Sequence, residues 1–178
     1  MLTKTFKNFM MLMLERSSAD PRGLIAATGT NGTTYYLMNR FDNNSCFPYS
    51  INYGWRSNVS DYGIILGTGT TAPTEDDTTL ENIISGGLSV TVTQRSGVNS
   101  GVPFVEYNLA INNTGSASVT ISEVGYIQRL QAATASGGTS GSYYPFLLDR
   151  TVLTRPVTVP AGGTSIIRYT LTTREAEA

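Results

Sequence analysis

Apolar and polar residues alternate along much of the second half of the chain. Valine, leucine, tyrosine and isoleucine occupy every second position of residues 88–92 and 105–111, and mostly polar residues stand between them. The alternation returns at 119–127 and at 164–173. A period of two with one polar face is typical of half-buried antiparallel strands. These four segments therefore predict the centre of a β-sheet fold.

The apolar positions of these strands predict the core. They share large side chains that point inward in one register: Val90, Val92, Val105, Tyr107, Leu109, Ile111, Val119, Ile121, Ile167, Tyr169 and Leu171. Glu106 falls between two of them and is expected on the exposed face. The assignment depends on register, because a slip of one residue exchanges the two faces of a strand.

Shorter apolar stretches bounded by turn residues predict further strands at 34–38, 49–55, 64–66, 144–148, 151–153 and 157–159. Residues 131–142 are rich in Gly, Ser, Thr and Ala and are expected to form a flexible loop. Many short strands separated by frequent turns predict an all-β fold, an antiparallel β-sandwich that is Ig-like or jelly-roll-like.

The first residues follow a helical period instead. Large apolar side chains recur three or four positions apart at Leu2, Phe6, Phe9 and Met13, with Met10 and Leu14 beside them. This spacing predicts an amphipathic helix. Pro21 and Gly23 end the segment. We therefore expect an N-terminal helical arm over residues 1–23 and a β-sandwich domain over residues 24–178.

The apolar stripe of the arm needs a covering surface, because an isolated helix of this length is marginal in water. Packing on its own domain and docking on a neighbouring subunit both fit the pattern. A membrane surface fits less well, since only two lysines could hold anionic lipid. We expect docking between subunits, because Met and Phe suit an irregular surface that forms on assembly. The expected subunit-contact residues are Phe6, Phe9, Met10 and Met13.

Composition narrows the range of partners. Only 14% of the 178 residues are charged, and the formal net charge is −1. Such a chain lacks the positive field that gathers nucleic acid. No stretch approaches the roughly 18 apolar residues of a membrane span, and the start of the chain is a poor match to an export signal. We therefore expect neither nucleic acid nor a membrane as a partner.

Two absences argue against an enzyme. The sequence has no His and one Cys, Cys46, so it cannot supply a Ser-His-Asp or Cys-His nucleophile. The commonest metal ligand is also missing. The Gly-Thr-Gly turn at 67–69 is not a phosphate loop, because no lysine follows at the required spacing. We expect no enzymatic activity, cofactor or metal site. The remaining catalytic hypothesis is a carboxylate pair formed by Glu123 and Asp149.

Three charged residues interrupt the apolar strand segments. Asp149 and Arg150 are adjacent, so their side chains point to opposite faces of a strand and cannot pair with each other. Glu123 lies on a different predicted strand and is the expected partner of Arg150. The acidic run at 75–77 lacks the frame of a calcium loop and is expected to be a solvated turn.

Five phrases of the sequence resemble phrases that recur, in the same order and spacing, in structural proteins of tailed bacteriophages. They are 66–81 (LGTGTTAPTEDDTTLE), 111–116 (INNTGS), 119–125 (VTISEVG), 147–153 (LLDRTVL) and 157–163 (VTVPAGG). The resemblance implies a virion component that is made in the host bacterial cytoplasm. It implies a homo-oligomer in a symmetric assembly that contacts other virion proteins, in the tail, baseplate or neck or as a capsid decoration.

An alternative function uses the aromatic residues between 35 and 55. This region holds Tyr35, Tyr36, Phe41, Phe47, Tyr49, Tyr53 and Trp55. Tyr and Trp anchor interfaces at low cost in conformational entropy. The alternative is a module that binds carbohydrate or a host surface. Packing of the same rings in the core and in hairpins is the simpler interpretation.

Overall fold

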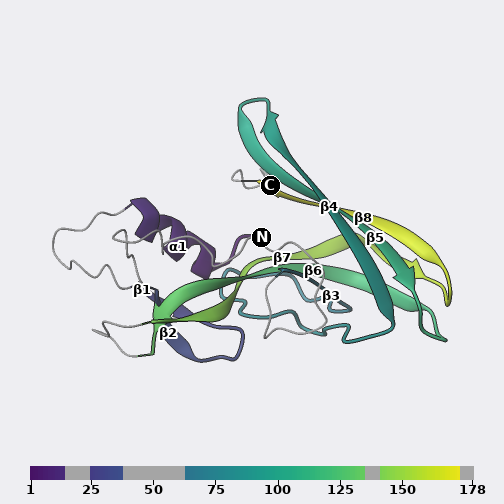
Figure 1. The fold of residues 1–178 in the computed structure, drawn as a ribbon, viewed down its shortest axis with the longest axis horizontal. Coiled ribbons are helices and arrows are strands. Elements are labelled where there is room, and N and C mark those ends of the chain that lie inside the picture. The colour runs from purple at the N-terminus through teal and green to yellow at the C-terminus, as the bar shows by residue number, and fades with distance from the viewer. Residues whose placement is uncertain (15–24, 38–62, 135–140, 173–178) are drawn as a thin grey trace.

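A computed structural model of the chain consists mainly of antiparallel strands (Figure 1). It describes residues 1–14, 25–37, 63–134 and 141–172. The elements are α1 (Lys4–Leu14), β1 (Ile25–Thr28), β2 (Thr34–Leu37), β3 (Gly63–Gly67), β4 (Leu88–Asn99), β5 (Val102–Asn113), β6 (Val119–Ala133), β7 (Ser142–Val159) and β8 (Thr164–Thr172). Cys46 and the predicted strand at 49–55 lie outside the described residues.

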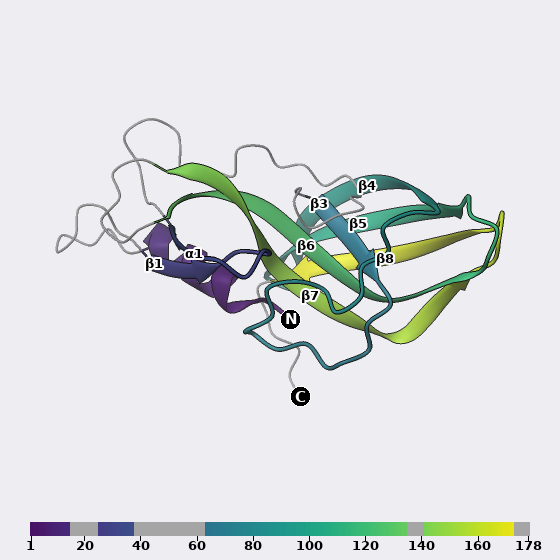
Figure 2. The same cartoon turned by 90° about the horizontal axis from the view of Figure 1, so that it is seen from below.

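The strands form two sheets that pack against each other (Figure 2). The five-stranded sheet has the order β1-β2-β6-β3, and β7 pairs with the other side of β6. The three-stranded sheet has the order β4-β5-β8. One core cluster contains residues of both sheets, and the ring of Tyr107 stacks on that of Tyr126 with centroids 5.7 Å apart. The chain is therefore an antiparallel all-β molecule, as the alternation predicts.

The predicted register of the central strands is confirmed. Tyr107, Leu109 and Ile111 on β5 are at most 3% exposed. Val92 and Ile167 lie opposite Leu109 on the two neighbouring strands. The other predicted core residues are buried in the same cluster or pack against it. Alternation alone was sufficient for β4, β5 and β8, because each of these strands has one polar face.

Glu106 lies on the outer face of the three-stranded sheet, as expected, but neighbouring side chains cover it. It is 6% exposed. Arg95 donates two hydrogen bonds to its carboxylate, at 2.7 and 3.1 Å, and Arg168 lies 3.7 Å away. The hydrogen bond from Arg95 lowers the pKa of Glu106. The long arginine stems, and not depth in the core, exclude water from this carboxylate.

Several strands extend further than the sequence pattern predicts, and the segments predicted as separate strands at 144–148, 151–153 and 157–159 form one continuous strand, β7. β4 runs on to Asn99, and Ser100 and Gly101 then form the turn to β5 with positive φ angles of 49° and 81°. Two positive φ angles are characteristic of a type I′ hairpin turn. β6 continues through Ala132 and Ala133, which are 0% and 2% exposed. The loop predicted from residue 131 is therefore wrong at its start, because alanine packs well where space is tight.

The helix predicted at the start of the chain is present and lies against β1 and β7 of its own chain. Thr3 caps it: its hydroxyl oxygen accepts the N–H of Phe6 at 3.3 Å and the hydroxyl donates to the carbonyl of Leu147 at 2.7 Å. Phe6 packs against the core cluster. Within the described residues, no helix has the length and apolar character to span a membrane.

Candidate functional site

A buried ion pair lies on the face of the five-stranded sheet that points away from the three-stranded sheet. Glu123 on β6 and Arg150 on β7 are 0% and 3% exposed. Arg150 Nε donates to Glu123 Oε2 at 2.9 Å. The two residues are diagonal neighbours, since Glu123 lies opposite Val152 and Arg150 opposite Gly125. The pair predicted from different strands is confirmed.

The loop between β3 and β4 supplies the other partners of this carboxylate. Glu123 Oε1 accepts the backbone N–H groups of Gly69 at 3.0 Å and Asn82 at 2.9 Å. Oε2 accepts the N–H of Glu81 at 3.3 Å in addition to the bond from Arg150. A buried carboxylate is tolerated only when its oxygens are paired in this way. The loop therefore folds around Glu123.

Gly67 and Gly69 leave room for the carboxylate. A Cβ atom added to Gly69 would lie 2.5 Å from Glu123 Oε1, and one added to Gly67 would lie closer still. Both distances are shorter than real Cβ contacts. The Gly-Thr-Gly turn therefore binds a carboxylate of the same protein, and the N–H of Gly69 is occupied by it.

The guanidinium of Arg150 joins two further acids to the network. Nη1 donates to Asp77 Oδ2 at 2.9 Å, and Nη2 lies 3.6 Å from Glu81 Oε2. Burial opposes the charge of Arg150, but hydrogen bonds to Asp77 and Glu123 outweigh it and raise the pKa of Arg150. Burial raises the pKa of Asp77, while hydrogen bonds from Arg150 and Thr74 outweigh it and hold that pKa below its usual value.

The acidic run at 75–77 forms a turn in which Glu75 and Asp76 are exposed, as expected from the sequence, but Asp77 is partly buried. Each acid has a basic partner: Lys7 for Glu75 at 2.8 Å, Lys4 for Asp76 at 3.7 Å and Arg150 for Asp77 at 2.9 Å. The first two pairs are exposed, and exposed pairs contribute little to stability. The turn nevertheless connects α1 to β7. Sequence reasoning missed these pairs because the partners lie 68 or more positions away.

Asp149 points to the opposite face, toward the three-stranded sheet. The hydroxyl of Tyr169 on β8 donates to Asp149 Oδ2 at 2.5 Å, and that of Thr151 donates to the same oxygen at 3.0 Å. Burial, and then the charge of Asp149, raise the pKa of Tyr169. Asp149 and Glu123 therefore lie on different faces of the sheet, each engaged by protein groups. The geometry does not bring them together as a catalytic pair.

The phrases that carry the phage resemblance meet in two places. Residues 66–81, 119–125 and 147–153 form the network around Glu123 and Arg150. The other two phrases, 111–116 and 157–163, meet at Asn113, which is 0% exposed. Its amide Nδ2 donates to the carbonyls of Val159 at 2.9 Å and Ala117 at 2.8 Å.

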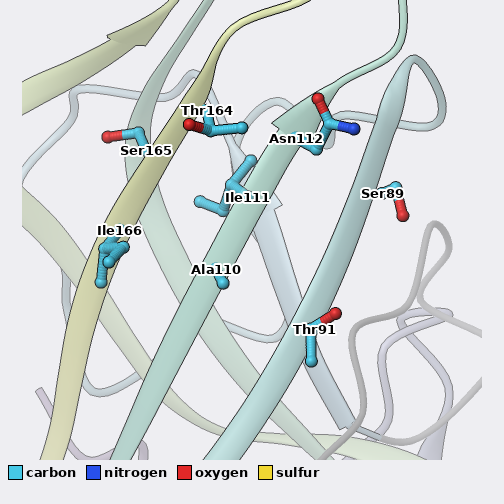
Figure 3. Close-up of a pocket in the computed structure, with 8 residues that line it drawn as sticks. All are labelled: Ser89, Thr91, Ala110, Ile111, Asn112, Thr164, Ser165 and Ile166. Atoms are coloured by element: carbon cyan, nitrogen blue, oxygen red, sulfur yellow. The ribbon is translucent and has the colours of Figure 1, made fainter.

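A shallow depression of about 670 Å³ marks the outer face of the three-stranded sheet (Figure 3). It is lined by Ser89, Thr91, Ala110, Ile111, Asn112, Thr164, Ser165 and Ile166. No charged side chain lines it, and Ile166 is 71% exposed. This surface offers neutral hydrogen-bonding groups and an apolar side chain. It has no group that would act as an acid or base near neutral pH.

The four expected subunit-contact residues are placed differently from one another. Phe6 packs on the core of its own chain, which matches the interpretation of the helix as part of its domain. Met10 is 38% exposed. The side chains of Phe9 and Met13 lie outside the described part of the structure. A contact between subunits through this helix stays a prediction.

The aromatic region of the alternative function is described only at its start. Tyr35 is 5% exposed, and its ring stacks on that of Tyr144 with centroids 4.0 Å apart. It therefore belongs to the core, as the simpler interpretation holds. The aromatic residues from 41 to 55 lie outside the described residues.

Comparison of the chain with protein-family models, with curated proteins and with solved structures gives no match. Within the described ranges, no three or more Cys, Asp or Glu side chains converge as ligands for a metal ion. The acids of the Glu123 network instead surround a guanidinium.

Proposed function

We propose that this chain is a structural component of a tailed-phage virion, in the tail, baseplate or neck or as a capsid decoration, and that it self-associates and binds neighbouring virion proteins. The observation that carries the proposal is the position of the five phrases that resemble phage structural proteins. They converge on two buried polar networks that hold sheets and loops together.

The chemistry of the described charged residues supports the same proposal. Glu123 accepts four hydrogen bonds, and Asp149 is held by Tyr169 and Thr151. A general acid or base must reach a substrate proton, and these buried carboxylates face protein groups instead. The proposal therefore assigns no enzymatic activity to this chain.

The finer description of the fold is part of the proposal. We infer that the two packed sheets form a β-sandwich of the Ig-like or jelly-roll-like type. The arm over residues 1–23 would contact a neighbouring subunit through the side of α1 that carries Met10, while Phe6 holds the helix on its own domain. The 38% exposure of Met10 supports that division of roles.

Immunogold electron microscopy tests the function. Antibodies raised against the purified chain are applied to purified particles of the phage that carries the gene, and to the lysate from which the particles were separated. We expect labelling at regular positions on the particles. A protein that is abundant in the lysate but absent from the particles would refute the virion role. Binding to a glycan array that Trp55→Ala abolishes would favour the carbohydrate-binding alternative.

A further inference from the structure

Within the described residues, each outer edge of the five-stranded sheet receives at least one hydrogen bond from another part of the chain. Along β7, the N–H of Thr3 donates to the carbonyl of Leu148 at 3.0 Å. At β3, the N–H of Ile84 donates to the carbonyl of Leu66 at 2.9 Å. At β1, the amide of Asn8 on α1 donates to a strand carbonyl at 3.1 Å. Covered edges of this kind prevent a sheet from pairing with another chain.

The outer edge of β4 has no such cover within the described residues. No backbone or side-chain group of the described ranges hydrogen-bonds to it, and its residues from Thr93 to Asn99 are exposed. β4 is 12 residues long and contains no Pro or Lys. β8, the other outer strand of the same sheet, is shorter, with 9 residues, and carries Arg168 at its centre. A long, regular strand edge with free N–H and C=O groups is a template for another strand.

The charge on β4 favours a second copy as that partner. Arg95 is the one charged residue of the strand. Its guanidinium is already paired with Glu106 of the same chain, at 2.7 and 3.1 Å. Two β4 strands therefore meet without net charge repulsion. Antiparallel pairing of two β4 strands has a two-fold axis, so every hydrogen bond between the copies forms twice. Two-fold symmetry is also the commonest symmetry of homo-oligomers.

We propose that two copies of this chain pair β4 with β4, antiparallel, and join their three-stranded sheets into one continuous sheet. The proposal rests on the self-association in the proposed function and names its surface. The exposed Ser and Thr side chains of β4 would form cross-strand pairs, which stabilise sheets. The uncharged depressions of the two copies would then lie beside each other on one face.

Lysines on the strand edge test the pairing. Thr91→Lys with Thr93→Lys places like charges at the two-fold junction, while Ile166→Lys with Thr170→Lys adds the same charge on the outer face of β8. Light scattering over a dilution series measures the dimer, and circular dichroism confirms that each variant is folded. We expect the β4 variant to raise the dissociation constant roughly 100-fold or more and the β8 variant to leave it unchanged.

A charge-swap experiment identifies the symmetry. The β4 lysine variant is mixed with Thr91→Glu and Thr93→Glu protein, and we expect a heterodimer to form again, because β4 of one copy faces β4 of the other. A wild-type chain that is monomeric throughout, a lysine variant that still dimerises, or loss of dimer in the β8 variant would each overturn the proposal. If the protein is found on particles but stays monomeric in solution, the β4 pairing is wrong and the virion role stands. If the protein dimerises but is absent from particles, the virion role is wrong and the pairing stands.

Discussion

At the scale of single residues, the Glu123 carboxylate is the most constrained group described. It is removed from water, and its stability in the fold depends on one guanidinium and three backbone N–H groups. Removing a charge from water costs several kcal/mol unless the partners compensate. Gly67 and Gly69 make that compensation sterically feasible.

Removing the guanidinium should therefore destabilise the protein strongly. We expect Arg150→Met to lower the free energy of unfolding by about 3–5 kcal/mol, because it leaves the Glu123 charge buried without its cation. Glu123→Gln combined with Arg150→Met should cost clearly less than the sum of the two single changes. Denaturant unfolding of the four proteins measures this. Additive costs would show that the two side chains do not interact.

The shifted pKa values predict how stability varies with pH. The pKa of Asp77 is lowered in the folded state, so its contribution is present above its ordinary pKa of about 4 and is lost as pH falls below that value through the lowered pKa. The pKa of Tyr169 is raised, so its contribution is present below about pH 10 and is lost as pH rises beyond it. Asp77→Asn should reduce the loss of stability at acid pH. Tyr169→Phe should remove the contribution of Tyr169 to the loss of stability at alkaline pH. Melting temperatures across the pH range measure both, and unchanged slopes would contradict the assignment.

At the scale of elements, the sequence predicted the position and register of a strand wherever that strand has one solvent-exposed face. β5 was predicted to within a few residues because its burial alternates with its side chains. β6 was harder, since most of its residues from Ile121 onward are buried on both faces and alternation disappears. The Glu123–Arg150 pair could be predicted from strand identity. Its link to Asp77 could not, because 73 positions separate that residue from Arg150.

The register of β5 and β8 makes a matched pair of predictions. Leu109→Ala should cost about 2–5 kcal/mol, because Leu109 is 0% exposed in the centre of the core. Ile166→Ala should change stability by less than about 0.5 kcal/mol, because that side chain is 71% exposed on the adjacent position of the next strand. Urea melts of both variants check the register. If Ile166→Ala destabilised the protein more than Leu109→Ala, the assignment of inner and outer faces in this sheet would be wrong.

The helix α1 separates a structural residue from a proposed contact residue. Phe6→Ala should lower the free energy of unfolding by about 1–2 kcal/mol, because its ring packs partly buried on the core. Met10→Ala should leave monomer stability nearly unchanged and weaken incorporation into particles. Thermal melts and particle assembly assays separate the two effects. If Met10→Ala assembles normally, α1 serves only its own domain.

At the scale of the whole molecule, one core joins the two sheets. Tyr107 and Tyr169 come from the three-stranded sheet, Tyr126 comes from the five-stranded sheet, and their rings stack with centroids 5.7 and 6.1 Å apart. Asp149 adds a hydrogen bond between the sheets through Tyr169. Neither sheet can therefore lose its partner without exposing the shared core.

This shared core predicts a single unfolding transition for the described strands. The near-ultraviolet circular dichroism of the stacked tyrosines and the far-ultraviolet signal of the strands should disappear at the same denaturant concentration. Leu109→Ala should move both midpoints together. A tyrosine signal lost well before the strand signal would mean that the sheets separate first.

The network around Glu123 also bears on how quickly the chain reaches its native state. Its members come from the loop after β3, from the middle of β6 and from β7, so no short segment can assemble it. A nascent chain has to reach residue 150 before the carboxylate acquires its cation, and until then burying Glu123 is unfavourable. Folds dominated by such distant pairings cross their main barrier in milliseconds to seconds, much later than helical bundles of similar size. During that interval the apolar residues of β3 stay open to water, and a cell that makes many copies at once would gain from chaperones that shield them.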